Sequence, residues 1–383
     1  MDTLGILKEL VAFDSQSGVS NKPIADYICS LLLAAGFQQN DILVTSNGPP
    51  GREKENIIAR KGVGPNALML AGHTDTVSPE PKKEWKTDPL VLTQKNSQLY
   101  GLGSTDMKAF LAAAIVTAEM FSVEQLLQPL VLVFTCDEEI GLLGAKDLKH
   151  RKLLTGIRYG IVGEPTQLVP VRLHKGYISA KVLIRGISAH SSDPKKGINA
   201  IERAVDFISD LRVYRQELNE YVNRLLSPPY PTLSIGAING GLETNRVPSE
   251  CRLKFDIRPI PGQRPDEIMA DLQRLAGQKG MIENKPAVEI KFNSSPTPPM
   301  ETAASSLIVR VAQQVTNKEA TSVPFSTEAS IFNASGIETV ILGPGSIDQA
   351  HKPNEYIEAR YLEQTVETLR QIVTEICCKP EWR

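Results

Sequence analysis

Residues 67–77 read ALMLAGHTDTV, an apolar run that ends in a histidine and an aspartate. The run Ala67–Ala71 is continuous rather than alternating, which is typical of a strand buried on both faces of a sheet. His73 and Asp75 follow at a spacing of two, so both side chains project from the same side of an extended backbone. The stretch therefore predicts a buried strand that delivers two candidate metal-binding side chains at its carboxyl end.

Other segments extend this strand into an α/β domain. Leu130–Thr135 and Tyr159–Val162 are also continuous apolar runs, and the alanine-rich helix expected at Met107–Phe121 lies between strands, as a crossover helix does. These features predict a doubly wound catalytic domain built from residues 1–176 and 294–383.

The residues between these two parts follow a different pattern. Residues 177–293 give the order strand, helix, strand, strand, helix, strand, which is the ferredoxin-like βαββαβ arrangement. Tyr177–Arg185 and Cys251–Ile260 alternate apolar and polar residues, as in a sheet with one open face. The sequence therefore predicts an inserted domain, which ends at a proline-rich linker beginning at Ser294.

The composition narrows the class of partner. The 383 residues carry 42 basic and 44 acidic side chains, mixed along the chain, so no footprint for nucleic acid or an anionic membrane is expected. No stretch reaches the ~18 consecutive apolar residues of a membrane span, and the first residues do not resemble a signal peptide. The five cysteines lack a CxxC motif, as in reduced thiols. We expect a cytoplasmic protein that acts on a small molecule.

Further metal-type side chains follow the predicted strands or open the helix that leaves one: Asp106, Glu138, Glu139, Glu164 and His351. The carboxyl ends of strands in a doubly wound sheet open onto one crevice, so these side chains are expected to meet there. Imidazoles and carboxylates together suit zinc, and a carboxylate has two oxygens with which to bridge two ions. Each residue alone is more often a helix cap, a solvated acid or a surface histidine. Their recurrence at five strand ends favours a metal site.

Eight segments resemble, in order, the motifs of the dinuclear zinc aminoacylase and carboxypeptidase family: GHTDTV, GLGSTDMK, CDEEIGLLGA, GEPT, HKGY, GISAHSSDP, STEAS and GPGSIDQAH. The resemblance runs from the first helix to the last. It implies a zinc-peptidase-like catalytic domain, an inserted dimerisation domain and two Zn²⁺ per subunit, for which Co²⁺ is a plausible substitute.

The resemblance also implies a role for each metal-type residue. His73 and Glu164 would hold one zinc ion, Glu139 and His351 the other, and Asp106 would bridge the two. Asp75 would contact the His73 side chain rather than a zinc ion and would thereby orient the imidazole. Glu138 would be the general base, and the peptide bond between Asp106 and Met107 would be cis.

His190, in the inserted domain, matches a family histidine that reaches the active site of the partner subunit. The resemblance therefore implies a homodimer in which this imidazole stabilises the oxyanion formed during hydrolysis. The alternative is that His190 is simply a residue of a turn, beside Ser191 and Asp193.

The expected reaction is hydrolysis of the amide that joins an acyl group to the amino nitrogen of a small free amino acid. The α-carboxylate of such a substrate favours an arginine partner. The positions that match substrate contacts of the family are Arg258, Asn245 and Lys175. Thr327 would add a hydroxyl, and Glu328 would accept a terminal ammonium of the substrate. For Arg258, an ion pair with Glu250 or Asp256 is the alternative.

Two rivals stay open. The first is a desuccinylase acting on N-succinyl-diaminopimelate, or a dipeptidase, on the same scaffold. The second is a non-catalytic, zinc-stabilised binding protein. Glu138 argues against the second rival, because a structural zinc site is closed by four protein ligands and needs no additional acid beside them.

Overall fold

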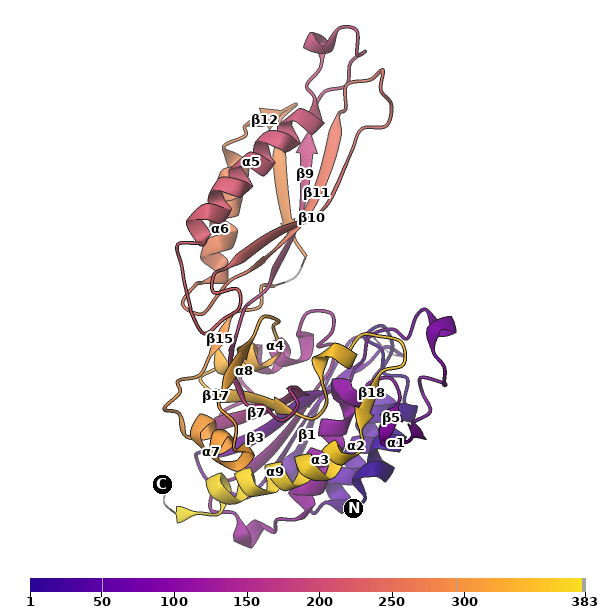
Figure 1. The fold of residues 1–383 in the computed structure, drawn as a ribbon, viewed down its shortest axis with the longest axis vertical. Coiled ribbons are helices and arrows are strands. Elements are labelled where there is room, and N and C mark those ends of the chain that lie inside the picture. The colour runs from indigo at the N-terminus through magenta and orange to yellow at the C-terminus, as the bar shows by residue number, and fades with distance from the viewer. Residues whose placement is uncertain (50, 294, 381–383) are drawn as a thin grey trace. The chain divides into compact units, whose positions relative to one another are not determined.

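Four neighbouring parallel strands form the centre of the larger sheet (Figure 1). They are β6 (Leu130–Thr135), β3 (Ala67–His73), β7 (Ile157–Pro165) and β17 (Glu338–Gly343). Every residue of β3 and β6 is buried. The continuous apolar runs therefore predicted these central strands correctly.

Further strands make this nine-stranded sheet mixed. Its order is β1-β2-β6-β3-β7-β17-β8-β15, with β16 paired to β8. β1, β2 and β8 run antiparallel to their neighbours. The added strands are β1 (Ile42–Asn47), β2 (Lys54–Lys61), β8 (Val171–His174), β15 (Met300–Glu301) and β16 (Thr321–Val323).

Helices cover the sheet. They are α1 (Thr3–Ala12), α2 (Lys22–Ala34), α3 (Ala109–Glu119), α4 (Leu143–His150), α7 (Leu307–Thr316), α8 (Ala329–Asn333) and α9 (Arg360–Cys377). The first ten residues of α3 are buried, as expected for a helix that is apolar on all sides. α3 begins two residues later than predicted, because Asp106 and Met107 have non-helical backbone angles. The helix packs close behind Glu164: a Cβ on Gly163 would lie 1.9 Å from the Phe110 ring.

Besides β1, β2, β8, β15 and β16, three short strands were not predicted: β4 (Thr93–Lys95), β5 (Gln98–Tyr100) and β18 (Tyr356–Glu358). Three residues are too few to show a period, so the sequence carries no signal for them. β18 pairs antiparallel with β5, which joins the segment after His351 to the segment before Asp106.

The chain divides into two units, and the structure, a computed structural model, describes residues 1–49, 51–293 and 295–380. The large unit comprises Met1–Arg172, Glu301–Thr321 and the chain from Thr327 onward, and the small unit comprises Leu173–Met300 and Ser322–Ser326. The expected boundaries of the insertion, residues 177 and 293, thus fall inside the small unit. Ser294, the first residue expected in the linker, lies outside the described residues.

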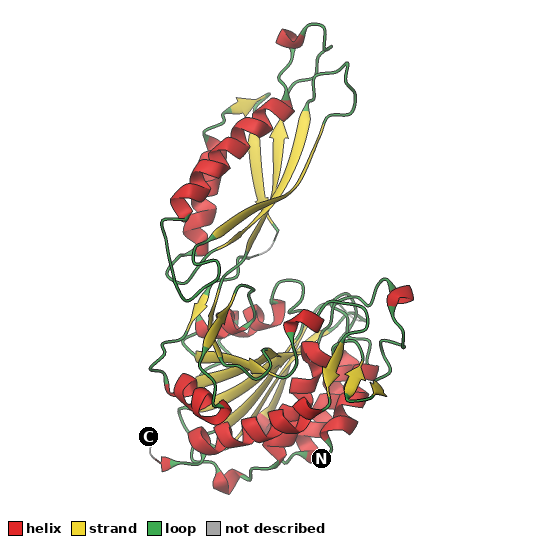
Figure 2. Cartoon of the chain, viewed as in Figure 1, coloured by secondary structure: helices red, strands yellow, loops and turns green. Residues whose placement is uncertain are grey.

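The small unit has a four-stranded antiparallel sheet in the order β10-β11-β9-β14. Its βαββαβ elements are β9 (Ile178–Arg185), α5 (Ala200–Leu218), β10 (Thr232–Gly240), β11 (Glu250–Arg258), α6 (Pro265–Gly277) and β14 (Val288–Phe292). Both helices lie on one face of the sheet (Figure 2), as the alternating burial of β9 and β11 requires. The ferredoxin-like prediction is confirmed. A hairpin of β12 (Met281–Ile282) and β13 (Lys285–Pro286) was not foreseen.

No helix in the described part of the chain is long and apolar enough to cross a membrane.

Candidate metal centre

The four central strands bring the candidate ligands to one edge of the sheet. His73 is the last residue of β3, Glu138 and Glu139 follow β6 after two residues, and Glu164 lies one residue before the end of β7. His351 follows β17 by way of a loop. Because the four strands are parallel neighbours, their carboxyl ends lie at the same edge of the sheet.

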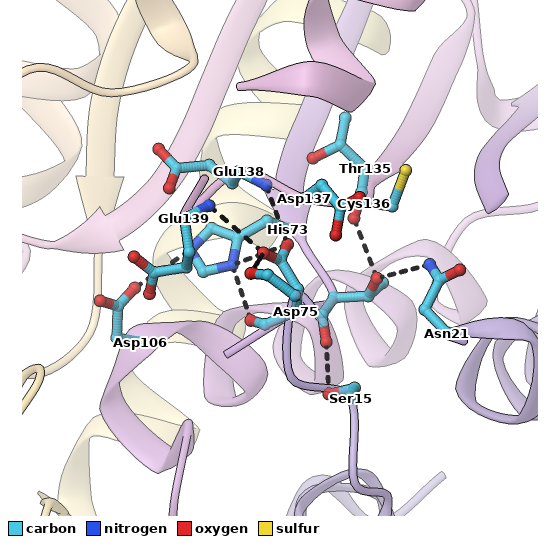
Figure 3. A network of polar contacts seen from close by, with 12 residues as sticks. Ser15, Asn21, His73, Asp75, Asp106, Thr135, Cys136, Asp137, Glu138 and Glu139 are labelled. Carbon is cyan, nitrogen blue, oxygen red and sulfur yellow. Dashed lines mark hydrogen bonds and ion pairs between the residues drawn. The ribbon is translucent and has the colours of Figure 1, made fainter. Parts of the chain in front are cut away.

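Asp106 lies between the two histidines. Its Oδ1 is 3.1 Å from Nε2 of His73, and its Oδ2 is 3.2 Å from Nε2 of His351. The two oxygens of one carboxylate therefore face two different imidazoles, which is the arrangement that a bridging ligand requires. Figure 3 shows the carboxylates of Asp106 and Glu139 on the same side of the His73 ring. The peptide bond between Asp106 and Met107 is cis, as the resemblance implied.

Each imidazole also has a second carboxylate nearby. Nε2 of His73 is 3.9 Å from Oε1 of Glu164, and Nε2 of His351 is 2.9 Å from Oε1 of Glu139. Ligand atoms of His73, Asp106 and Glu139 all lie within 4.8 Å of one another. A nitrogen and an oxygen on each side of a shared carboxylate form a donor set that fits a pair of divalent ions.

Asp75 supports this centre in two ways. Nδ1 of His73 lies 2.9 Å from the carbonyl oxygen of Asp75 and 3.7 Å from its carboxylate. Because a carbonyl only accepts, Nδ1 carries a proton, and Nε2 is the ring nitrogen that faces Asp106 and would bind a metal ion once its own proton is displaced. The Asp75 carboxylate instead accepts the backbone N–H groups of Glu138 and Glu139, at 3.1 and 3.2 Å, and the hydroxyl of Ser17 at 2.8 Å. One residue thus positions both a ligand and the expected general base.

The ionisable groups of the centre hold protons that metal ions would displace. Burial, together with the nearby Glu164 and Glu139, raises the pKa of Glu138 well above its usual range. Hydrogen bonds to Asp106 and Glu139 raise the pKa of His351 to about 11. Burial opposes ionisation of Asp106, but the hydrogen bonds from His351 and His73 lower its pKa. Because ligands must be deprotonated, metal binding here is expected to release protons.

Glu328 and Thr327 lie in the same unit. Glu328 is fully buried, its Oε2 accepts the Thr135 hydroxyl at 2.7 Å, and its Oε1 has no hydrogen-bond partner among the described residues. Burial raises the pKa of this carboxyl to about 7. Thr327 is buried, and its hydroxyl oxygen accepts the N–H of Ala329 at 3.2 Å.

Arg258 and Lys175 belong to the small unit. The Arg258 guanidinium lies over the Tyr177 ring at 4.2 Å, and its Nε is 3.7 Å from Asp256, so the alternative ion pair is present in loose form. Lys175 is buried and donates to the carbonyl of Tyr230 at 2.7 Å. Burial and the neighbouring Arg258 lower the pKa of Lys175 to about 8.

His190 and Asn245 lie on adjacent segments of the small unit. The N–H of Ser191 donates to the carbonyl of Asn245 at 3.0 Å. The N–H of Ser192 donates to Nδ1 of the exposed His190 at 3.1 Å. Nδ1 therefore acts as an acceptor, and Nε2 of the neutral ring carries the proton. The ring is thus prepared to donate from Nε2.

Sequence reasoning missed three supporting groups. Besides Ser17, Lys54 donates to Asp137 at 2.6 Å and to the carbonyl of Ser17 at 2.8 Å, which connects the strand β2 to the loop that carries Glu138, the expected general base. Glu355 accepts backbone N–H groups around Asp106. A carboxylate four residues after a candidate ligand was the only signal for Glu355.

Three features are typical of a metal-dependent hydrolase: the parallel strands at the centre of the sheet, the Asp106 carboxylate between two imidazoles, and Glu138 beside them. Comparison with known proteins agrees. Residues 69–375 match the model of peptidase family M20/M25/M40. The chain belongs to this family.

Curated relatives include two acetylornithine deacetylases. That of Pasteurella multocida is 37% identical, with 96% of this chain and 94% of the relative covered, and that of Proteus mirabilis is 38% identical, with 96% and 93% covered. A metallo-carboxypeptidase of Sulfolobus solfataricus has the same fold, with a TM-score of 0.77, 19% identity and coverage of 97% and 99%. A dinuclear metal-binding peptidase of Bacillus subtilis has a TM-score of 0.67, 13% identity and coverage of 98% of each chain. The chain is thus a hydrolase, and the interpretation as a non-catalytic binding protein is wrong.

Proposed function

We propose that this enzyme removes the acetyl group from N2-acetyl-L-ornithine, giving L-ornithine and acetate, as a step of arginine biosynthesis. The observation that carries the proposal is the Asp106 carboxylate, whose two oxygens face two imidazoles, in a chain 37% identical to an acetylornithine deacetylase. We further propose a cytoplasmic homodimer with two Zn²⁺ per subunit, which Co²⁺ would replace with retention of activity.

The proposed ligands divide into two groups. His73 and Glu164 would hold one ion, Glu139 and His351 would hold the other, and Asp106 would serve both. The distances between their donor atoms support this division. A bound pair of ions would polarise the amide carbonyl and lower the pKa of the attacking water toward about 7.

Glu138 is the proposed general base and acid. Its raised pKa suits a carboxylate that takes a proton from water and returns it to the leaving amine. Asp75 fixes the backbone of Glu138, so the carboxylate starts from a defined position. The imidazole of His190, contributed by the neighbouring subunit, donates from Nε2 to the oxyanion.

Dimerisation is proposed through the small unit. β10 is an edge strand of its sheet and carries the half-exposed Ile238. On α5, Ile201, Val205 and Val213 are 37%, 56% and 56% exposed. Apolar side chains beside an open edge support pairing of two small units about a two-fold axis.

Complementation tests the shared site. We expect His190→Ala and Glu138→Gln each to be inactive alone and to recover part of the activity when mixed, because one site of the heterodimer has both residues intact. Full inactivity of the mixture, with subunit exchange shown by mass spectrometry, would refute a role for His190 in the partner's site.

The proposed substrate contacts are Arg258 for the α-carboxylate, with Asn245, Lys175 and Thr327 as further contacts. Arg258 offers a guanidinium, which pairs with a carboxylate in bidentate fashion. Glu328 is proposed as the acceptor for the terminal ammonium, since its Oε1 is a buried acceptor that has no hydrogen-bond partner among the residues that the structure describes. Glu328→Gln should therefore raise KM for N-acetylornithine more than for N-acetylmethionine, which has no such ammonium.

Steady-state hydrolysis by the zinc-loaded enzyme tests the substrate. The substrates to compare are N-acetylornithine, N-succinyl-diaminopimelate and N-acetylmethionine. We expect kcat/KM for N-acetylornithine to exceed the values for the other two by at least about tenfold. Preference for the succinyl substrate would establish the rival desuccinylase, and turnover of dipeptides alone would establish a dipeptidase.

A further inference from the structure

Glu355 is a buried carboxylate for which the proposed mechanism has no role. Glu355 is 2% exposed and lies four positions after His351. Its oxygens accept three backbone hydrogen bonds: Oε2 from Gly103 at 2.8 Å, and Oε1 from Thr105 at 2.8 Å and Asp106 at 3.0 Å. All three donors belong to the segment that presents the bridging carboxylate.

That segment needs an external acceptor for its N–H groups. Gly103 has a left-handed φ of 75°, and Asp106 and Met107 have non-helical backbone angles, so the turn before α3 cannot pair its own N–H groups as a regular helix does. The N–H groups at the start of a helix also lack acceptors within the helix. Glu355 supplies the acceptor in a region where Gly103, Thr105 and Asp106 are closed to solvent.

Other contacts fasten the same two segments together. The carbonyl of Glu355 accepts the N–H of Gly101 at 3.1 Å, and the carbonyl of Tyr356 accepts the Thr105 hydroxyl at 2.8 Å. The pairing of β18 with β5 continues this contact. The stretch that begins at His351 therefore carries one proposed ligand and, four residues later, the group that holds the backbone of another.

We propose that Glu355 is a positioning residue of the metal centre, which fixes the backbone of Asp106 relative to His351 and so sets the separation of the two metal positions. This inference rests on the proposed dinuclear function. Glu355 acts through Asp106 rather than by touching an ion or the substrate. Groups that orient a ligand typically contribute 10- to 100-fold in metal affinity or activity.

Two substitutions and one matched control test the role. Glu355→Ala removes all three acceptors, whereas Glu355→Gln keeps one oxygen and turns an NH₂ group toward an N–H donor. The control is Glu358→Gln, a change of the same chemistry on β18, where the carboxylate is 39% exposed and forms an ion pair with Nε of Arg360 at 2.7 Å. The readouts are zinc affinity by competition with a chelator, kcat and KM for N-acetylornithine, and amide hydrogen exchange.

We expect Glu355→Ala to bind zinc about 10- to 100-fold more weakly and to lower kcat at saturating zinc, with KM changed less than about twofold. The amides of Gly103, Thr105 and Asp106 should exchange faster. Glu355→Gln should lie between Glu355→Ala and the wild type, and Glu358→Gln should match the wild type.

A folded Glu355→Ala enzyme with the zinc affinity, kcat and exchange rates of the wild type would overturn the proposal. If that variant does not fold, a Glu355→Gln enzyme identical to the wild type would overturn it. A wild type that binds two zinc ions but hydrolyses no acyl amino acid would refute the proposed function alone, since affinity and exchange still test Glu355. A wild type that binds fewer than two ions would overturn both.

Discussion

His73 and His351 face the same carboxylate from different kinds of structure. His73 ends a buried strand, its side chain is 1% exposed, and the Asp75 carbonyl fixes its ring. His351 lies in a loop at a left-handed φ of 57°, and its side chain is 52% exposed. Both rings nevertheless approach Asp106 to within 3.2 Å.

The difference indicates that the two proposed metal positions are not equivalent. His73 and Glu164 lie on adjacent parallel strands, and Phe110 packs closely against Gly163, the residue before Glu164. The half that contains His351 depends on a loop and on the contacts of Glu355. We expect the buried half to hold its ion more tightly, because rigid, dry surroundings preserve the ligand geometry.

Removing the shared ligand should have the largest effect. Asp106→Ala should lose both ions and all measurable activity, because the carboxylate serves both halves. Metal analysis after gel filtration measures this, with Asp348→Ala, an exposed aspartate in the His351 loop, as the control. A variant that retains two equivalents of zinc would refute the bridging role.

Glu138→Gln should separate chemistry from metal binding. We expect kcat to fall by more than about a thousandfold while metal content stays unchanged, since proton uptake and return both need the carboxylate. The hydrogen bond from the Glu138 N–H to Asp75 is a backbone contact and should survive. Near-normal turnover would show that another group is the base.

Single substitutions of the two histidines should show that the two metal positions differ in affinity. His351→Ala should lose the ion of its own half and keep the ion held by His73 and Glu164. His73→Ala should lower the affinity for the more tightly held ion by about 10- to 100-fold. Chelator titration of each variant measures the affinity of the ion that remains. Equal affinities in the two variants would mean that burial does not distinguish the halves.

Acid should weaken metal binding at the half that contains His351. Hydrogen bonds to Asp106 and Glu139 raise the pKa of His351 to about 11, so an ion must displace a proton there. Protons compete more strongly as the pH falls. We expect the affinity of this position to drop about tenfold per pH unit for each proton released. Zinc titrations at pH 6 and pH 8 that give the same affinity would contradict this.

The sequence predicted the elements that have a strong pattern. The apolar strand ending at His73 was found because burial on both faces leaves a continuous apolar run, and the strand Cys251–Ile260 was found because burial on one face leaves an alternating pattern. The three-residue strand β18 was missed, since so few residues show no period. The metal-type ligands were recognisable by residue type and by their place at strand ends.

The groups that hold those ligands were harder to predict. Ser17, Lys54 and Glu355 act through hydrogen bonds to the backbone or to a second carboxylate, and such contacts depend on the tertiary fold rather than on residue spacing. Asp75 was recognised as a partner of His73, yet its carboxylate binds the backbone of Glu138 and Glu139.

A crystal structure of the zinc-loaded enzyme, with anomalous data at the zinc edge, tests whether Asp106 joins two metal ions. We expect two anomalous peaks roughly 3.5–4 Å apart, with one oxygen of Asp106 at each peak and His73 and His351 on opposite sides. A single peak, or two peaks that Asp106 does not join, would contradict it.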